Sequence, residues 1–443
     1  MIDKDWVEGT LGDIFETVTG NTPSKKDKDN YGSELPFIKP PQIKNNILKN
    51  YSEFLSKKGK IKARILPVNS ILVTCIGNLG RVGMNKIEVA FNQQINAIKP
   101  LKEVEPKFTF YQAQSIGFKN QLERLSTSTT VALVNKTSFN SVRFKIAPLP
   151  VQRAIVAKIE ELFSSLDSGI TDLKKAQEQL KVYRQAVLKK AFEGELTKEW
   201  RQENKLQFDW ENTTTGEVMT DISSGSTPKA EFLSTKGEIQ FLKVYNLNFD
   251  GSLNDQKDPA FISKEIHRTR NKRAITKAGD VLINIVGPPL GKTSMIPLSS
   301  KLEFNINQAI VRFRSNEKIL PKFLSFFLQN PETINWLEGT SKATAGQYNV
   351  KVTTCRVIPI SLPNVSEQHQ IVKEIESRLS VYDQVELTIK GSLKKAEALR
   401  QSILKKAFEG KLLSEVEIAK CKQAKDYEPA SVLLQRIKKE KNG

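Results

Sequence analysis

The nine residues LKKAFEGEL (188–196) and LKKAFEGKL (404–412) are nearly identical and stand 216 positions apart. Two unrelated surface helices are not expected to share a nearly identical stretch of nine residues. If a larger unit is duplicated, the flanking residues should match as well. Reading backward from both copies at the same offset gives five further matches. They are Gln152 with Gln368, Ile155-Val156 with Ile371-Val372, Ile159-Glu160 with Ile375-Glu376, Asp167 with Asp383, and Arg184-Gln185 with Arg400-Gln401. The repeated unit is therefore a segment as long as a whole helix.

The segments in front of the two repeats also correspond. Asp5-Trp6 and Gly12 recur as Asp209-Trp210 and Gly216 at an offset of 204, and Gly20-x-Thr22-Pro23 recurs as Gly225-x-Thr227-Pro228 at 205. This period is far longer than that of a solenoid repeat, so it indicates duplication of a whole module. We divide the 443 residues into a first domain (1–148), a first helical spacer with its linker (149–208), a second domain (209–363) and a second helical spacer with the C-terminal tail (364–443).

Apolar residues in both repeats recur mostly at spacings of three and four, which is typical of a coiled-coil seam. They predict a helix over residues 152–193 and an equivalent helix in the second copy, each roughly 60 Å long at about 1.5 Å per residue. Gly194 and Gly410 follow these helices and can adopt the left-handed conformation that closes a helix. The apolar positions are Ile155, Ile159, Leu162, Leu166, Ile170, Leu173, Leu180, Val187 and Ala191, then Ile371, Ile375, Leu379, Tyr382, Ile389, Leu393, Ala396, Ile403 and Ala407.

Neither helix can bury its apolar stripe alone, and pairing the two helices covers both stripes. We expect an antiparallel coiled coil that holds the two domains at opposite ends of a rod, with approximate two-fold symmetry. The alternative is two unrelated surface helices, each packed on its own domain, which would leave the shared phrase unexplained. The expected fold class is α+β, with two mixed α/β domains separated by two long helices that pair with each other.

Composition indicates a multidomain protein of a reducing compartment. A chain of 443 residues exceeds what one hydrophobic core normally organises. Its three cysteines, Cys75, Cys355 and Cys421, have no paired spacing and give no basis for a disulfide framework. The N-terminal residues lack the pattern of a signal peptide, and no run approaches the roughly 18 apolar residues of a membrane span. We expect a cytoplasmic protein.

The net charge of +19 lies mainly on the two domains. Residues 1–148 hold 22 Lys and Arg against 13 Asp and Glu, and residues 213–363 hold 19 against 13, whereas residues 149–212 hold 11 of each. A polyanion that docks on both domains is the simplest partner for this distribution, because neutralising phosphates dominates nucleic-acid affinity. A generic lysine-rich surface is the alternative that charge alone leaves open.

Glycine-rich loops follow a predicted strand in each domain but do not match a nucleotide site. The strands are expected at 70–74 and 280–284, and the loops at 77–83 and 287–293. The second loop has three residues between Gly287 and Gly291, where a Walker A loop needs four, and two of them are prolines without N–H groups. The first loop lacks the dinucleotide spacing. A turn that brings Arg81 or Lys292 toward a DNA backbone fits better.

Catalytic signatures are missing from the sequence. His267 and His369 are the two histidines, and neither has zinc-ligand spacing with Cys, Asp or Glu. No Gly-x-Ser-x-Gly and no Asn/Asp-Pro-Pro-aromatic string is present. We expect His369, at the polar start of a helix, to be solvated, and we predict no catalytic and no metal-binding residue.

Residues suited to reading DNA occur in corresponding loops of both domains. Lys pairs with guanine and Asn or Gln with adenine edges, while Lys and Thr also bind phosphates. For each residue an ordinary solvated side chain is the alternative, and the pair Gln94 and Gln308 could equally be buried structural glutamines. The candidates are Thr22, Lys25, Lys26, Lys39, Gln42, Lys44, Asn45, Arg81 and Thr129 in the first domain, and Thr227, Lys229, Lys243, Tyr245, Asn246, Arg268, Arg270, Arg273, Lys292, Lys342 and Gln347 in the second.

Three motifs together give the chain a recognisable pattern. They are Gly-x-Thr-Pro near each domain start, Leu362-Pro363 followed by Glu367-Gln368-x-x-Ile371-Val372, and Leu-Lys-Lys-Ala-Phe-Glu-Gly at each helix end. With these motifs the chain resembles the specificity subunit of type I restriction-modification enzymes over essentially its whole length. One departure is visible, because Leu149-Pro150-Val151-Gln152 is three residues shorter than the second copy and lacks its Glu.

The resemblance implies a non-catalytic subunit that binds double-stranded DNA and two modification subunits, and through them two restriction subunits. Those partners would use S-adenosylmethionine, ATP and Mg, and this chain would bind no cofactor itself. Two different basic domains imply an asymmetric, non-palindromic site in two parts, each read in the major groove, with half-site centres roughly 34–36 Å apart. The residues expected on the helical spacers that bind the partner subunits are Ile159, Leu166, Leu173, Phe192, Ile375, Leu393, Ile403 and Phe408.

Two other functions remain open at this point. One is a self-contained enzyme that acts on nucleic acid, which the missing motifs disfavour. The other is a coiled-coil scaffold that binds only proteins, which the concentration of charge on the domains disfavours. The sequence gives neither the bases that are read nor the length of the spacer between the half-sites, because readout depends on loop conformation and DNA shape.

Overall fold

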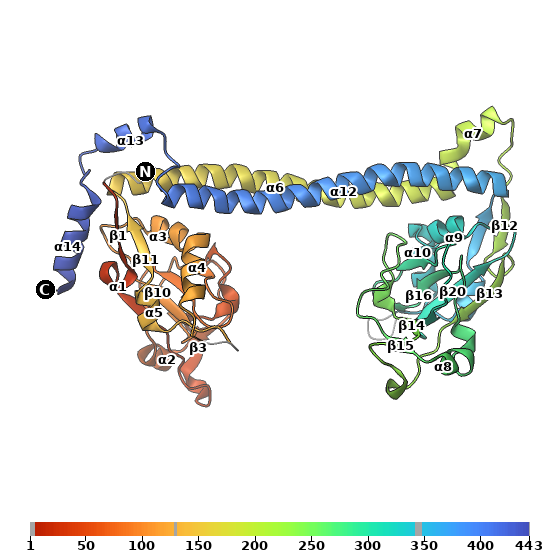
Figure 1. Ribbon diagram of the computed structural model, residues 1–443, viewed down its shortest axis with the longest axis horizontal. Coiled ribbons are helices and arrows are strands. Elements are labelled where there is room, and N and C mark those ends of the chain that lie inside the picture. The colour runs from red at the N-terminus through yellow and green to blue at the C-terminus, as the bar shows by residue number, and fades with distance from the viewer. Residues whose placement is uncertain (1–4, 128–130, 342–347, 443) are drawn as a thin grey trace. The chain divides into compact units, whose positions relative to one another are not determined.

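A computed structural model describes residues 5–127, 131–341 and 348–442. It divides into two compact units (Figure 1). The first unit comprises Met1–Leu173 and Gly391–Gly443, and the second comprises Lys174–Lys390. Each unit therefore combines one globular domain with parts of two helices that are far apart in the sequence.

The two long helices are α6 (Leu149–Phe192) and α12 (Val365–Phe408), each 44 residues long. In the first unit the start of α6 packs with the end of α12, and Arg400 forms an ion pair with Asp167. In the second unit the end of α6 packs with the start of α12, and the Arg184 guanidinium lies 5.8 Å from the Tyr382 ring. The helices are thus antiparallel in both units. Within the described residues, no helix is long and apolar enough to cross a membrane.

The domain of the first unit holds two mixed sheets and a two-stranded ribbon. The strand orders are β2-β10-β7-β8-β4, β5-β3-β9-β6 and β1-β11. The strands are β1 (Val7–Thr10), β2 (Thr17–Thr19), β3 (Tyr31–Ile38), β4 (Asn46–Ile47), β5 (Phe54–Leu55), β6 (Ile65–Leu66), β7 (Ile71–Thr74), β8 (Val82–Met84), β9 (Val89–Phe91), β10 (Ile95–Ile98) and β11 (Arg143–Ile146). The short helices are α1 (Leu11–Ile14), α2 (Lys57–Lys62), α3 (Pro106–Ala113), α4 (Ile116–Arg124) and α5 (Lys136–Asn140).

The domain of the second unit repeats this topology. Its strand orders β13-β20-β16-β18, β15-β14-β19 and β12-β22 follow those of the first domain, but each of its two sheets is one strand shorter, since β4 and β6 have no counterpart, and a ribbon β17-β21 is added. The strands are β12 (Glu211–Thr214), β13 (Met219–Ser224), β14 (Ile239–Leu242), β15 (Phe261–Ile262), β16 (Val281–Asn284), β17 (Val286–Gly287), β18 (Thr293–Met295), β19 (Asn305–Ile306), β20 (Ile310–Ser315), β21 (Tyr348–Asn349) and β22 (Pro359–Leu362). The helices are α8 (Lys264–Arg268), α9 (Pro321–Phe327), α10 (Pro331–Thr340) and α11 (Val352–Arg356).

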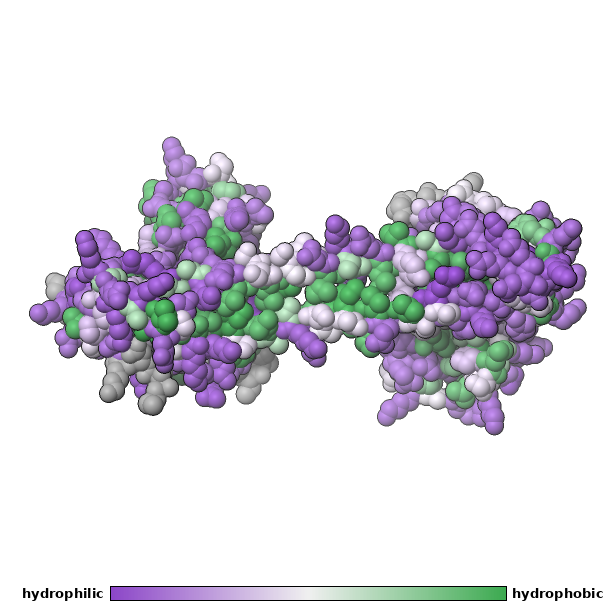
Figure 2. All heavy atoms as spheres, turned by 90° about the horizontal axis from the view of Figure 1, so that it is seen from above, coloured by the Kyte–Doolittle hydropathy of each residue, from purple (hydrophilic) through white to green (hydrophobic). Residues whose placement is uncertain are grey.

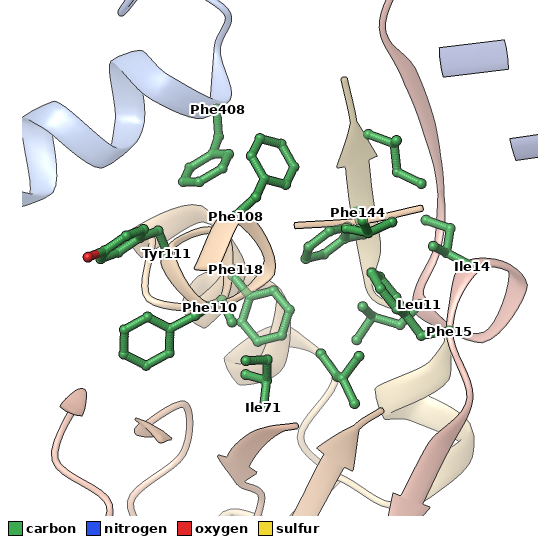
Figure 3. Packing of buried hydrophobic residues seen from close by; sticks show 14 of the residues in the cluster. Leu11, Ile14, Phe15, Ile71, Phe108, Phe110, Tyr111, Phe118, Phe144 and Phe408 are labelled. Atoms are coloured by element: carbon green, nitrogen blue, oxygen red, sulfur yellow. The ribbon is translucent and has the colours of Figure 1, made fainter. Parts of the chain in front are cut away.

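The repeated phrase at the helix ends docks each helix on a domain. Phe408, at the end of α12, packs edge-on against Phe108 of α3, with ring centroids 5.3 Å apart (Figure 3). Phe192, at the end of α6, packs against Phe323 of α9 at 5.2 Å. Gly194 and Gly410 then adopt left-handed φ values of 76° and 71°, as predicted. The nine-residue sequence therefore occurs twice because the chain makes the same contact between a helix end and a domain twice.

The segments that follow the two helix ends return to the start of a domain. After α6, the helix α7 (Lys198–Glu203) leads into β12. After α12 comes α13 (Glu415–Lys422), and then α14 (Ala430–Asn442), which packs beside β1 and α1. Asp5 receives a hydrogen bond from the Tyr427 hydroxyl at 2.5 Å and an ion pair from Lys422 at 3.1 Å. The bond from Tyr427 is the main cause that lowers the pKa of Asp5 below its ordinary value. The C-terminal tail is therefore part of the first unit.

Candidate nucleic-acid interface

The Gly-x-Thr-Pro loop is built the same way in both domains. A Cβ on Gly20 would lie 2.2 Å from the Asn92 carbonyl oxygen, and one on Gly225 would lie 2.1 Å from that of Asn307. Glycine is required at both positions because any side chain would collide with the neighbouring backbone. The Thr22 hydroxyl donates to Gln93, and the Thr227 hydroxyl accepts from the Gln308 N–H at 3.3 Å. Each loop is thereby fixed against the Asn-Gln turn that follows β9 or β19.

A short basic segment braces this loop in each domain, and sequence reasoning did not single it out in the first. There the Asn21 amide donates to the Lys62 carbonyl at 2.8 Å, and Arg64 donates to the Thr19 carbonyl at 2.6 Å. In the second domain Arg273 donates to the Gly225 carbonyl at 3.4 Å. The signal that could have found this segment is Phe54-Leu55-Ser56-Lys57, which recurs as Phe261-Ile262-Ser263-Lys264; both serines cap a helix that starts with the lysine.

The glycine loop meets two other candidate segments. In the first domain the Val82 N–H donates to the Asn45 side-chain oxygen at 2.9 Å, and the Gly77 N–H donates to the Ala132 carbonyl at 2.8 Å. A cavity of about 430 Å³ opens there. It is lined by Asn45, Gly77, Asn78, Leu79, Gly80, Arg81, Lys119, Glu123 and Ala132. The structure therefore brings the predicted residues Asn45 and Arg81 to one site, although 36 residues separate them.

The second domain makes the corresponding contacts. The Thr293 N–H donates to the Asn248 carbonyl at 2.9 Å, and the Val350 N–H donates to the Ile285 carbonyl at 2.9 Å. Lys292 lies beside this junction with its ammonium 5.7 Å from the ring of Phe249, half of which is exposed. Three loops that are distant in the sequence thus converge in each domain.

Two of the predicted DNA-binding residues stabilise a turn within their own domain. Gln42 accepts from the Lys39 N–H at 2.9 Å, and Asn246 accepts from the Lys243 N–H at 2.8 Å, so each closes a short 3₁₀ turn. Asn246 is 2% exposed and also donates to the carbonyls of Asn254 and Lys257, both at 2.9 Å. Its amide is fully used inside the domain and does not face a ligand in this structure.

Among the described residues, some of the predicted cations have a carboxylate or aromatic partner and others are exposed. Lys39 pairs with Glu53, Arg268 with Glu303 at 2.6 Å, and Lys229 with Glu231 at 3.9 Å. Lys243 and Arg270 lie over the rings of Tyr245 and Phe232 at 5.6 Å and 4.9 Å. Lys25, Lys26, Lys44 and Arg81 are exposed. Thr129, Lys342 and Gln347 lie outside the described residues.

The predicted residues of the helical spacers are mostly covered by the chain itself. Ile159 and Ile375 are fully buried, Ile403 and Phe408 are 7% exposed, and Leu166, Leu173, Phe192 and Leu393 are partly buried. Exposed apolar side chains lie elsewhere on the helices, and Figure 2 shows hydrophobic surface along them. They include Val182 and Tyr183 on α6 and Val381, Val385 and Leu387 on α12, which are 41–66% exposed and belong to the second unit, and Leu399 on α12, which is 51% exposed and belongs to the first. That α6 and α12 bind another subunit stays a prediction.

The cysteines and histidines form no chemical site among the described residues, where no cluster of three His, Cys, Asp or Glu could hold a metal. Cys75 and Cys355 are buried, and burial raises the pKa of each thiol to about 12. His267 is buried against Glu303 at 3.2 Å and Asn305 at 3.2 Å, whereas His369 is exposed, as predicted.

Comparison with known families decides the identity of this arrangement. The family model for the type I restriction modification DNA specificity domain matches residues 3–181 and 208–397. The chain belongs to this family. The match covers both domains and most of both helices, so the predicted resemblance, the fold class and the role as a non-catalytic DNA specificity subunit are confirmed.

Curated relatives of the specificity family align along the whole chain. The type I restriction enzyme EcoKI specificity subunit of Escherichia coli (strain K12) is 24% identical over 452 residues, covering 99% of this chain and 96% of that protein. The EcoBI specificity subunit of Escherichia coli is 26% identical over 458 residues, covering 99% and 93%.

Two solved structures share the fold of this specificity subunit. A chain from a study of the assembly and conformational transition of the type I R-M system has a TM-score of 0.70 at 18% identity, covering 93% of this chain and 100% of that chain. The HsdS subunit from Thermoanaerobacter tengcongensis has a TM-score of 0.51 at 18% identity, covering 93% and 98%.

Proposed function

We propose that this specificity subunit reads a DNA site in two parts, one part per domain, and directs adenine methylation and restriction by partner subunits to that site. The observation that carries the proposal is that each of two domains of similar topology holds a Gly-x-Thr-Pro loop against a basic segment and brings a glycine loop together with two other loops. The loops are held at equivalent places by different hydrogen bonds, and they carry different side chains. Two readers with different side chains favour a non-palindromic target.

The charge of the domains supplies the affinity for DNA in this proposal. Both domains are basic, and their basic segments flank the loops that would meet the bases. Contacts to phosphates position a protein on the duplex without reading its sequence, whereas contacts to base edges discriminate. We therefore assign Lys25, Lys26 and Lys57 to the phosphates of the first half-site, and Arg268, Arg270 and Lys272 to those of the second.

The exposed apolar patch on the helices suits the modification subunits. It consists of Tyr183 on α6 and of Val381 and Val385 on α12, all in the second unit. Val381 and Val385 are four residues apart and share one face of their helix. Tyr183 precedes Arg184, whose guanidinium lies over the ring of Tyr382. Several apolar side chains grouped on one surface are typical of a protein–protein interface. We propose that a modification subunit covers this patch and that two such subunits carry two restriction subunits in turn.

The chemistry in this proposal is supplied by those partners in the cytoplasm. The modification subunits would use S-adenosylmethionine, and the restriction subunits would use ATP and Mg. The contribution of this chain would be selection of the sequence and placement of the partners on it, with no cofactor of its own.

Sequencing of methylated adenines at single-molecule level tests the proposal. A host that carries this chain with its neighbouring methyltransferase is compared with the same host after deletion of the chain. We expect one two-part motif to disappear on deletion. An unchanged pattern of methylation would contradict the proposal, and DNA binding by the purified chain at several salt concentrations would then distinguish a protein-only scaffold from a DNA-binding protein.

A further inference from the structure

A buried polar residue at the end of one strand fixes the glycine loop in each domain. The Thr74 hydroxyl, at the end of β7, donates to the Asn78 carbonyl at 2.6 Å and accepts from the Arg81 N–H at 3.0 Å. The Asn284 side chain, at the end of β16, accepts from the Lys292 N–H at 2.9 Å and donates to the Pro289 carbonyl at 3.0 Å. Thr74 and Asn284 are 0% and 2% exposed. Thr74 and Asn284 thus occupy equivalent positions, and each fixes the main chain of the glycine loop that follows it.

The main chains of Arg81 and Lys292 are held on both sides. Besides the bonds to their N–H groups, the Arg81 carbonyl accepts from the Thr74 N–H at 3.0 Å, and the Lys292 carbonyl accepts from the Asn284 N–H at 3.1 Å. Each side chain therefore leaves the domain from a fixed point of the backbone. A fixed origin is what a base-reading side chain needs, because the direction of a hydrogen bond to a base edge is specific.

The triplet before each cation is also shared. Leu79-Gly80-Arg81 and Leu290-Gly291-Lys292 each begin with a buried leucine and continue with a glycine of positive φ, 73° and 93°. A Cβ on Gly80 would lie 3.1 Å from Lys119 of α4, and one on Gly291 would lie 3.0 Å from Ile334 of α10. The loop is pressed against the equivalent helix in both domains, so it has little freedom to move.

The side chains themselves are available. Arg81 is exposed at the rim of the cavity of about 430 Å³, and within the part of the chain that the structure describes no hydrogen bond or ion pair holds its guanidinium. The Asn45 oxygen is occupied by the Val82 N–H, so its NH₂ group is left as a donor beside Arg81. The Lys292 ammonium contacts the exposed face of Phe249 and, among the described residues, no carboxylate. Both sites therefore present donors to a ligand that must offer acceptors.

We infer that Arg81 and Lys292 are equivalent specificity-determining residues, each of which contacts the O6 and N7 acceptors of a guanine in the major groove of its own half-site. This inference rests on the proposed function. The proposed function does not say which residue reads which base, and the inference names both. Guanine is the base whose major-groove edge carries two adjacent acceptors, and arginine and lysine are the side chains that match it. A phosphate contact is the other role open to a cation, and the experiment separates the two.

The experiment uses the subunit assembled with its modification subunits, as wild type and as Arg81→Ala, Lys292→Ala and Arg124→Ala. Arg124 is an exposed arginine on α4 and serves as the charge-matched control. Methylated adenines are sequenced, and binding is measured on duplexes with each base pair of the site replaced in turn. We expect Arg81→Ala to lose about 5- to 150-fold of discrimination at one G·C pair of one half-site, from the roughly 1–3 kcal/mol of a base contact.

The expected results for the other variants are equally specific. Lys292→Ala relaxes one G·C pair in the other half-site only, and Arg124→Ala leaves the recognised sequence unchanged. Thr74→Val, which removes the hydroxyl that positions Arg81, relaxes the same G·C pair as Arg81→Ala but to a smaller extent. A merely structural role for Thr74 would lower the melting temperature and leave the recognised sequence as it was.

Two outcomes would overturn the inference. If Arg81→Ala weakens binding to all duplexes equally and lowers the salt dependence, Arg81 contacts a phosphate. If the variant recognises the wild-type sequence with wild-type discrimination, the glycine loop does not read DNA. Both results differ from a failure of the proposed function, in which the wild-type assembly itself directs no methylation to a two-part sequence.

Discussion

Gln152 and Gln368 make the same hydrogen bonds at the starts of the two long helices. The Gln152 side chain accepts from the Glu105 N–H at 2.9 Å and donates to the Ala147 carbonyl at 2.7 Å. The Gln368 side chain accepts from the Leu320 N–H at 2.8 Å and donates to the Pro363 carbonyl at 2.9 Å. Both glutamines are fully buried. Gln152 joins the start of α6 to the loop before α3, and Gln368 joins the start of α12 to the loop before α9. The other long helix ends on the same short helix in each case, α12 on α3 and α6 on α9.

Replacing either glutamine by leucine should destabilise its own unit by a similar amount. Gln152→Leu would leave one N–H and one carbonyl without their partner, and Gln368→Leu would leave one N–H and the carbonyls of Pro363 and Lys318, at a cost of about 1–3 kcal/mol per unsatisfied group. Hydrogen exchange should accelerate at Glu105 in the first variant and at Leu320 in the second. His369→Leu, next to Gln368 but exposed, is the control and should change neither. Equal protection at Glu105 in wild type and Gln152→Leu would contradict this account.

The sequence repeats predicted two similar domains and two long helices, because residues that make the same contact in both copies are the same in both copies. The leucine, alanine and phenylalanine of the repeated sequence are apolar at helical spacing, and the structure packs them in a domain core, with Phe192 alone of the six only partly buried. The sequence could not show that Phe192 and Phe408 contact α9 and α3, because which domain receives a helix end depends on the direction of the pairing. Pattern alone predicts a buried stripe, and only the fold shows what covers it.

The candidate DNA-binding residues were harder to predict, because the same side chain can cap a turn or face a ligand. Asn246 and Asn45 stand in similar polar stretches, yet the amide of Asn246 is used within its own turn, whereas Asn45 keeps its NH₂ group at a cavity. The basic helix α2 was missed because the repeat of Phe54-Leu55-Ser56-Lys57 as Phe261-Ile262-Ser263-Lys264 is inexact and shows only a capped helix, not a contact with the Gly-x-Thr-Pro loop. Its place became visible only once the Asn21 amide was found bonded to its end.

The junction where the two copies differ offers a direct test of a buried charge pair. Glu367, which has no counterpart before the first helix, is 2% exposed and receives hydrogen bonds from Arg201, from Thr197 at 2.7 Å and from the Trp210 indole at 3.1 Å. Glu367→Leu should cost about 3–5 kcal/mol, since it leaves the buried Arg201 guanidinium without its carboxylate. Trp210 reports the change through its fluorescence during urea unfolding.

The double variant distinguishes a charge effect from a packing effect. Arg201→Met combined with Glu367→Leu should be closer to wild type than Glu367→Leu alone, because no buried charge is left unpaired. Additive losses in the two single variants would show that the ion pair contributes nothing specific to this junction.

Phosphate contacts by the basic helix α2 should appear in the salt dependence of DNA binding. Lys57, at the start of α2, is exposed, and within the described residues no ion pair holds it. Lys57→Ala should lower the slope of log affinity against log salt by about 0.9, the value for one phosphate contact, and should leave the recognised sequence unchanged. Lys102→Ala removes an exposed lysine between β10 and α3 and is the matched control. An unchanged slope in Lys57→Ala would place α2 away from the DNA.

A charge in the exposed apolar patch should block assembly without affecting DNA binding. Val381, 62% exposed on α12, is replaced by glutamate, and the same change at Val365, 39% exposed at the start of the same helix, is the control. Val381→Glu should abolish copurification with the modification subunit, because burying an unpaired charge at an interface is costly. Its affinity for DNA as the isolated chain should stay at the wild-type value. Assembly at wild-type strength would show that the modification subunit binds another surface.

Exchange of one domain tests the central claim most directly. Residues 5–148 are replaced by the corresponding domain of another specificity subunit whose two-part sequence is known, and methylated adenines are then sequenced in a host that carries the hybrid. The account predicts a motif in which one half is the donor's and the other half is unchanged from this chain. A motif that changes in both halves, or in neither, would contradict the assignment of one half-site to each domain.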